Sequence, residues 1–137
     1  TVVLREQQAL EEALRGLNPR EGLTQQAWEL LRGVFGERFE KAWDLVRQGR
    51  VKKYVFQPSG RVLWVVVGQE AEYLVYRYAG YCSCSDFYFR VLNQETAYCY
   101  HLLAQRLAES LEAYQTVKEE DRVYPALMEE WKRVFAG

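Results

Sequence analysis

The sequence predicts an α+β fold, a small antiparallel β-sheet with flanking helices. Apolar residues recur at steps of three and four between positions 10 and 46 and again between 103 and 135, as they do on one face of a helix. Between these stretches, residues 51–78 carry short runs rich in valine and tyrosine, which favour strands. All three cysteines and the one histidine follow, between positions 82 and 101. The expected order is therefore helices, a sheet, a cysteine-containing segment and more helices.

The length of 137 residues is that of one domain, with room for a docked extension at each end. We expect an N-terminal helix in residues 1–18 that docks on its own domain or on a partner, a central domain over 19–118 that contains helices, the sheet and the cysteines, and a C-terminal helix over 119–137. With 49% hydrophobic residues the chain can fill a packed core. A net charge of −1 argues against a globally basic surface for nucleic acid.

The sequence favours an intracellular protein without a membrane partner. No apolar run is long enough to cross a membrane, and the first residues lack the pattern of a signal peptide. Three cysteines cannot all pair within one chain, which favours a reducing compartment.

Three helices are expected before the sheet. The apolar stripe of the first contains Leu10, Ala13, Leu14 and Leu17. Asn18-Pro19 then ends that helix. The spacing of apolar residues predicts a second helix between Leu23 and Val34 and a third between Phe39 and Val46, with Gly49 in the position that follows many helices.

Three strands are expected in the middle of the chain. Residues 51–56 and 61–67 flank Gln57-Pro58-Ser59-Gly60, whose proline and glycine suit a hairpin turn. The run Trp64-Val65-Val66-Val67 is apolar at every position, which is typical of a central strand buried on both faces. Residues 72–78 form the third predicted strand.

Two helices are expected at the end of the chain. Leucines that recur at every fourth residue predict a helix over about residues 99–118. Asp121 is the predicted N-cap of a last helix, with Pro125 tolerated in its first turn. The apolar face of this last helix combines Tyr124, Leu127, Met128, Trp131 and Phe135.

The cysteines and the histidine form two pairs of equal spacing, Cys82 with Cys84 and Cys99 with His101. Alternate residues of a strand point the same way, so the Cys82 and Cys84 thiols can converge on one ion, whereas a disulfide between them would be strained. On a regular helix, residues two apart point to nearly opposite sides, so Cys99 should lie just before a helix or in its first turn. There the helix dipole should lower the pKa of the Cys99 thiol.

Three thiolates and one imidazole fill the tetrahedral shell of a structural zinc ion and leave no open position for a catalytic water. The alternative is that the cysteines are small buried apolar residues and that the histidine is an ordinary core or surface residue. Because all four fall within twenty positions in equal pairs, we predict a zinc site formed by Cys82, Cys84, Cys99 and His101.

The same segment resembles the SWIM zinc finger family. The shared features are the C-x-C pair followed by Asp86-Phe87 and the C-x-H pair followed by Leu102-Leu103-Ala104. The resemblance implies a ββα zinc finger, in which a small hairpin and a helix hold one zinc ion. It also implies contact with DNA or protein, and it gives ligand roles to Cys82, Cys84, Cys99 and His101.

Between residues 24 and 113 the chain is similar to the short SWIM-domain subunits of Shu-type recombination complexes. The matching positions are Phe35-Gly36, Ala42, Asp44-Leu45-Val46, Pro58-Ser59-Gly60-Arg61 and Gly68. This resemblance implies a non-catalytic adaptor subunit that pairs with a RecA-family recombinase paralogue, an ATPase, and assists DNA binding in homologous recombination and repair. It also implies contact with single-stranded or branched DNA as a complex, in the nucleus of a eukaryote or the cytoplasm of an archaeon. The alternative is a stand-alone SWIM zinc-finger module that binds nucleic acid or protein in a regulatory role.

Tyr100 occupies the position between the last cysteine and the histidine, where the SWIM-domain subunits commonly have lysine or arginine. A tyrosine does not neutralise a phosphate, but it can stack on a base. Other aromatic residues of the finger are Tyr81, Phe87, Tyr88, Phe89 and Tyr98. They favour a packed protein interface over an electrostatic contact with DNA, unless they belong to the core of the domain.

The strongest local run of basic residues has no acidic residue between positions 45 and 61. Its members are Arg47, Arg50, Lys52, Lys53 and Arg61. They are candidates for a phosphate-binding path. The alternative is a solvated strand edge that charge protects from aggregation.

Neither a nucleotide-binding loop nor a catalytic zinc motif is present. Gly33-Val34-Phe35-Gly36 lacks the Lys-Ser/Thr ending of a P-loop, and the His-x-Glu and Pro-Cys-x-x-Cys pattern of zinc deaminases is missing. We therefore expect no enzymatic activity and no small-molecule substrate, and ATP hydrolysis would belong to the partner.

Overall fold

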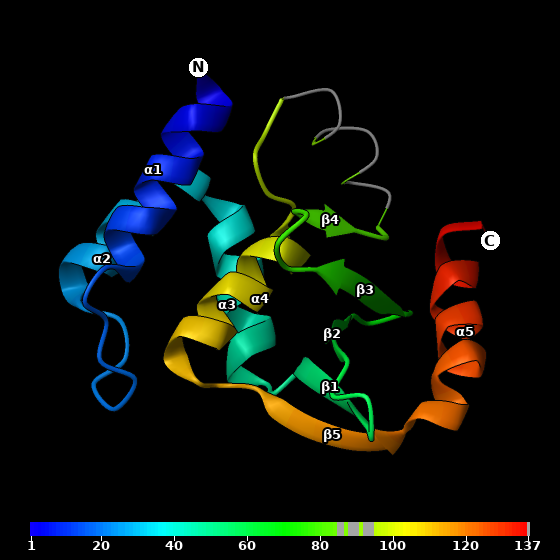
Figure 1. Cartoon of the computed structure of the whole chain (residues 1–137). Helices are drawn as coiled ribbons and strands as arrows, with labels where there is room; N and C mark the ends of the chain where they lie inside the picture. The colour runs from blue at the N-terminus through cyan, green and yellow to red at the C-terminus, as the bar shows by residue number, and fades with distance from the viewer. Residues whose placement is uncertain (85–86, 88–90, 92–94, 137) are drawn as a thin grey trace.

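The computed structural model describes residues 1–84, 87, 91 and 95–136, with the backbone alone for 133–136. The third and fourth helices of the chain lie on one side of a five-stranded sheet, with the first two packed beyond them, and the C-terminal helix lies on the other side (Figure 1). This arrangement confirms the α+β fold with flanking helices. None of the described helices is long and apolar enough to cross a lipid bilayer.

The first three helices are α1 (Val2–Leu14), α2 (Gln25–Phe35) and α3 (Glu37–Arg47). Threonine side chains cap the first two. Thr1 Oγ1 accepts a hydrogen bond from the Leu4 N–H at 3.2 Å, and Thr24 Oγ1 accepts one from the Ala27 N–H at 3.0 Å. Each cap satisfies a backbone donor that has no partner inside its helix.

α1 packs on α2, and Leu10 of its predicted apolar stripe is completely buried. The helix stops at Leu14, so Leu17 lies beyond its end. Gly36, with φ of 59°, separates α2 from α3, a conformation that glycine adopts readily. The N-terminal helices therefore form one packed group with the rest of the domain.

Five strands form one sheet in the order β4-β3-β2-β1-β5. They are β1 (Val51–Gln57), β2 (Val62–Val67), β3 (Glu72–Tyr76), β4 (Tyr81–Cys82) and β5 (Gln115–Glu120). The first four are antiparallel neighbours, and a turn at the predicted position joins β1 to β2. β2 has a strand on each side and completely buries Val65 and Val66, which confirms it as a central strand.

The helix predicted over residues 99–118 is wrong beyond residue 111. α4 (Tyr100–Leu111) ends at Glu112, whose φ of 54° is left-handed, and β5 follows and pairs in parallel with β1. The sequence of β5 is rich in glutamine, lysine and glutamate, which are good helix formers, but β1 offers it a row of unpaired backbone groups. The sheet is therefore mixed, and β1 is not an edge strand.

The chain ends in a 3₁₀ turn, η2 (Asp121–Val123), and in helix α5 (Tyr124–Ala136). Pro125 lies in the first turn of α5, as predicted, and Met128 and Trp131 are buried. The prediction that Asp121 caps this helix is wrong, because η2 intervenes and the Asp121 carboxylate accepts hydrogen bonds from the N–H and Oγ of Ser59, at 3.0 and 2.7 Å. The side chain of Phe135 lies outside the described residues.

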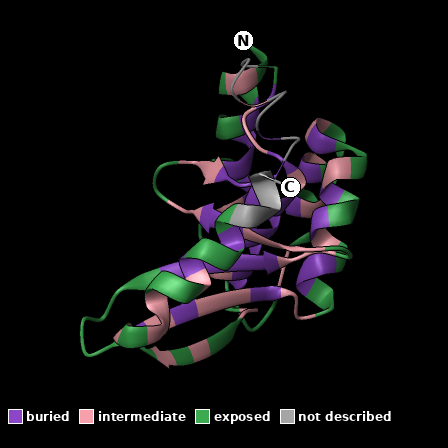
Figure 2. Ribbon diagram, turned by 90° about the vertical axis from the view of Figure 1, so that its right-hand side faces the viewer, coloured by how far each residue is buried: buried purple, intermediate pink, exposed green. Residues whose placement is uncertain are grey.

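Opposite residues on paired strands point to the same side, so the register assigns each residue to one face of the sheet. The helix face, toward α1 to α4, carries Val51, Lys53, Val55, Val62, Trp64, Val66 and Val75. The α5 face carries Lys52, Tyr54, Phe56, Leu63, Val65 and Leu74. Each face buries its own apolar cluster, whereas the turn between β1 and β2 is exposed (Figure 2).

Candidate metal centre

The hairpin of β3 and β4 positions the first cysteine pair. Cys82 is opposite Val75, and Ser83 holds the following bend because its N–H donates to Leu74 O and its Oγ accepts from Leu74 N–H, each at 3.0 Å. Cys84 comes next, and its Sγ accepts a hydrogen bond from the Phe87 N–H at 3.3 Å. Both thiols therefore come from a strand end and its turn, as the spacing predicts.

The N-terminus of α4 positions the second pair. Cys99 is the N-cap, with its Sγ accepting from the Leu102 N–H at 3.4 Å, and His101 lies in the first turn. Because the chain is still extended at Cys99, two residues that a regular helix would separate can face the same point. This arrangement confirms the predicted position of Cys99.

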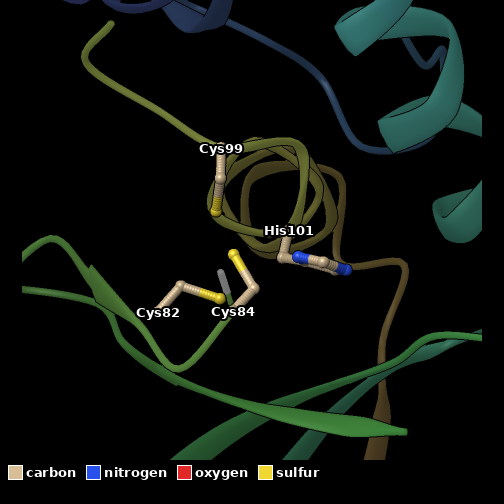
Figure 3. A group of neighbouring side chains, drawn as sticks. All are labelled: Cys82, Cys84, Cys99 and His101. Atoms are coloured by element: carbon tan, nitrogen blue, oxygen red, sulfur yellow. The ribbon is translucent and has the colours of Figure 1, made fainter. Parts of the chain in front are cut away.

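The three thiols lie close together in the interior, and the His101 side chain starts beside them (Figure 3). The ligand atoms of the two pairs all lie within 4.8 Å of one another, and all four residues are buried. Zn–S bonds of about 2.3 Å would place the sulfurs of a tetrahedral site about 3.8 Å apart. The cysteines are free thiols. The donor set and its dimensions therefore suit zinc.

The surroundings of His101 support the same assignment. Both of its imidazole nitrogens are buried without a hydrogen-bond partner among the described residues. The ring centroids of Tyr73 and Tyr100 lie 4.2 and 4.0 Å from that of His101 and hold the ring in place. A buried polar atom without a partner is unfavourable, and coordination of a metal would satisfy one nitrogen.

The three thiols differ in their pKa. Hydrogen bonds from Cys82 and Cys99 lower the pKa of Cys84, and the hydrogen bond to Cys84 raises the pKa of Cys82. Burial raises the pKa of Cys99. The predicted lowering at Cys99 is therefore wrong as a net effect, although the hydrogen bond from the Leu102 N–H acts in the predicted direction. A bound cation would favour all three thiolates.

A buried ion pair that the sequence did not reveal holds the chain just before Cys99. Glu6 of α1 pairs with Arg38 of α3 at 2.6 Å, and their side chains are only 4% and 17% exposed. Glu6 Oε1 accepts a hydrogen bond from the Ala97 N–H at 2.8 Å, and Arg38 Nη1 donates to Tyr98 O at 2.8 Å. The one sequence feature that could have indicated the burial of Glu6 is its position four residues before Leu10, on the same stripe of the helix.

The five basic residues proposed as a phosphate path do not lie on one face. Arg47 pairs with Asp44, and Arg50 donates to the carbonyls of Val67 and Gly68. Neighbours on a strand point to opposite sides, so Lys52 belongs to the α5 face and Lys53 to the helix face. The Arg61 guanidinium lies 4.1 Å from the ring centroid of Tyr124. The alternative of a charged strand edge is wrong, because β1 is paired on both sides.

Most described aromatic residues of the finger pack inward. Tyr81 contacts Phe87 with ring centroids 5.1 Å apart, and Tyr98 contacts Phe35 at 6.2 Å. Lys41 Nζ lies 5.7 Å from the ring centroid of Tyr100. Asp86, Tyr88 and Phe89 lie outside the described residues.

Comparison with known proteins yields zinc finger SWIM domain-containing proteins and an uncharacterized archaeal protein. A zinc finger SWIM domain-containing protein 7 homolog of Dictyostelium discoideum is 33% identical over 93 residues, 66% of this chain and 60% of the relative. Zinc finger SWIM domain-containing protein 7 of Mus musculus is 35% identical over 104 residues, 74% of this chain and 68% of the mouse protein. An uncharacterized protein of Archaeoglobus fulgidus is 28% identical over 113 residues, 82% of this chain and 90% of the relative.

No family model matches the chain, and no solved structure matches it significantly. The match to the mouse protein covers most of both chains, and this chain brings together the four donors expected of a SWIM finger. The chain therefore belongs to the zinc finger SWIM domain-containing protein 7 family, with zinc as its metal.

Proposed function

We propose that this protein is a non-catalytic adaptor subunit that pairs with a RecA-family recombinase paralogue and assists DNA binding in homologous recombination and repair. The observation that carries the proposal is the buried set of four protein donors. Four ligands complete the tetrahedral shell of zinc, so the metal holds a hairpin to a helix and leaves no position for a substrate. Function then belongs to the surfaces that this site supports.

The resemblance to Shu-type subunits suggests the process and the kind of partner, and membership of the SWIM family is consistent with both. The described structure adds a reason to assign ATP hydrolysis to the partner. Gly33 to Gly36 form the last turn and the C-cap of α2, and such a segment does not cradle phosphates as a P-loop does. The role would place the protein inside the cell, in the nucleus of a eukaryote or the cytoplasm of an archaeon.

A second candidate function is that of a stand-alone nucleic-acid-binding module. One cleft of about 380 Å³ favours it, because Lys41, Arg50, Tyr73 and Tyr100 line it beside the metal centre. Tyrosine rings can stack on bases, and the two cations can contact phosphates. Asp44 and Glu70 line the same cleft and oppose phosphate binding, so the adaptor is the better proposal.

Co-purification tests the proposal. The full chain, tagged and co-expressed with a RecA-family paralogue from the same genome, should co-elute with that ATPase and carry one zinc ion per chain. The variant Gln69→Ala, at an exposed turn position, should behave like the wild type, whereas His101→Ala should lose both zinc and partner. Absence of any bound ATPase, together with tight, salt-sensitive DNA binding by this chain alone, would favour the stand-alone module.

A further inference from the structure

The helix face of the sheet is uncovered at one end. Trp64 is only 6% exposed, whereas Val62, two residues earlier on the same face of β2, is 41% exposed. Val55 lies opposite Val62 and is half-buried, and Lys118 of β5 lies opposite Val55 and is exposed. The face therefore changes from core to surface between one row of residues and the next.

An apolar hollow of about 320 Å³ opens at this end, and its lining includes Val62, Trp64, Val75 and Tyr78. Tyr78, in the turn after β3, is 90% exposed. Within the described residues, Val62 and Tyr78 are two of only four large hydrophobic side chains that are exposed. Single exposed apolar residues are common, but two that share one hollow indicate a contact surface.

Two lysines, Lys53 of β1 and Lys118 of β5, lie on the same face of the sheet as the hollow. Lys53 precedes Val55 by two residues, and its Nζ lies 5.7 Å from the ring centroids of Trp64 and Tyr114. No ion pair involves Lys53 or Lys118 within the part of the chain that the structure describes. By contrast, Arg77 beside the hollow is paired with Glu109 at 2.7 Å.

We propose that this surface, the open sheet end (Lys53, Val55, Val62, Tyr78 and Lys118), docks a segment of a protein partner in which carboxylates flank a bulky apolar side chain. The apolar side chain fills the hollow, and the carboxylates pair with the two lysines. Such a surface has an apolar centre with charge at its rim, as protein interfaces do. The inference rests on the proposed function, because the partner in question is the RecA-family ATPase.

A nucleic acid fits the open sheet end less well. A phosphate backbone needs a row of cations, whereas this surface offers two lysines. The edges of a base would also lose hydrogen bonds to water in an apolar hollow.

The test compares variants of the full chain for their affinity toward the co-expressed ATPase. Val62→Glu should weaken binding at least about tenfold, since it places a carboxylate where the partner's apolar side chain packs. Lys118→Glu should weaken it about tenfold, since it places a carboxylate against a carboxylate of the partner. Lys118→Arg keeps the charge and should stay within about twofold. Val2→Glu is the matched control, because it makes the same substitution at another exposed valine. Val2 is 57% exposed and lies at the start of α1. Zinc content and melting temperature, measured on each sample, check that the fold is intact.

Each result decides between the two proposals. If the wild type binds the ATPase and Lys118→Glu binds equally well, the surface is wrong and the adaptor function stands. If the wild type binds no ATPase, both are wrong. If Lys118→Glu and Val62→Glu lose affinity for an oligo-dT strand but keep the ATPase, the surface belongs to nucleic acid and the protein-docking proposal is overturned.

Discussion

The surroundings of His101 explain why the fold of this protein depends on its metal. The His101 side chain is 2% exposed, its ring centroid lies 4.2 and 4.0 Å from those of two tyrosines, and its nitrogens find no hydrogen bond within the described structure. Three buried thiols share the same small space. Without a cation these groups destabilise the core, and with one they bind the β3–β4 hairpin to α4.

Loss of a zinc ligand should therefore unfold much of the domain. Cys84→Ser or His101→Ala should release the metal and lower the free energy of unfolding by more than about 3 kcal/mol, because the free energy of zinc binding in such sites is folding free energy. Metal analysis and thermal melting check this, with Gln69→Ala as the control. An unchanged melting temperature after chelation would contradict a structural role for zinc.

The buried pair of Glu6 and Arg38 permits a second prediction at the same scale. Arg38→Met leaves the Glu6 carboxylate buried with the Ala97 N–H and without its cation, so we expect a loss of about 3 kcal/mol in the free energy of unfolding. Arg32→Met is the matched control, because Arg32 pairs with Glu40 at the surface, where both side chains are largely exposed, and should lose less than about 1 kcal/mol.

Urea unfolding of the Arg38→Met and Arg32→Met variants measures the difference. Equal losses would mean that the buried pair does not hold the segment before Cys99. The zinc affinity of Arg38→Met should also fall, because Arg38 donates a hydrogen bond to the carbonyl of Tyr98, the residue before the zinc ligand Cys99.

Among the elements, α5 packs on the sheet through Trp131, its largest fully buried side chain among the described residues. Its side chain is 1% exposed, its ring centroid lies 5.0 Å from that of Tyr54, and its Nε1–H donates to Glu72 Oε2 at 3.2 Å. These contacts lie on the α5 face, with the sheet between them and the metal centre.

Trp131→Ala should therefore undock α5 and keep the zinc. The expected loss is about 3–5 kcal/mol, typical of a large side chain removed from a core. Limited proteolysis should cut the variant near residue 121, whereas Lys132→Ala, at an exposed neighbour, should be cut no faster than the wild type. Loss of zinc in Trp131→Ala would show that the two faces are coupled.

β5 is the element that sequence patterns describe least well. Its six residues, Gln115 to Glu120, have the composition of a helix end, and they follow a strongly helical stripe. They form a strand because Glu112 turns the chain and β1 has a free edge beside it. By contrast, β1, β2 and β3 could be predicted, because their apolar runs and the turn between the first two lie close together in the chain.

For the whole molecule, the division of the basic residues between two faces predicts weak DNA binding by the isolated chain. The affinity for a single-stranded oligonucleotide should depend on salt with a slope that corresponds to about two phosphate contacts or fewer. Lys52→Glu combined with Lys53→Glu should change that slope little, because the two side chains point to opposite faces. Titrations at several salt concentrations check this, and a slope that reports five contacts would contradict it.

By itself the sequence determined the zinc donors, the position of Cys99 before its helix and the hairpin of β1 and β2. Each of these depends on residue types and spacings within a short stretch, where backbone geometry leaves few arrangements. Only the tertiary structure decided that β5 joins β1, that Glu6 reaches Ala97, and that Val62 and Tyr78 line one hollow. Those features arise from contacts between segments far apart in the chain, and local periodicity carries no information about which distant backbone groups will pair.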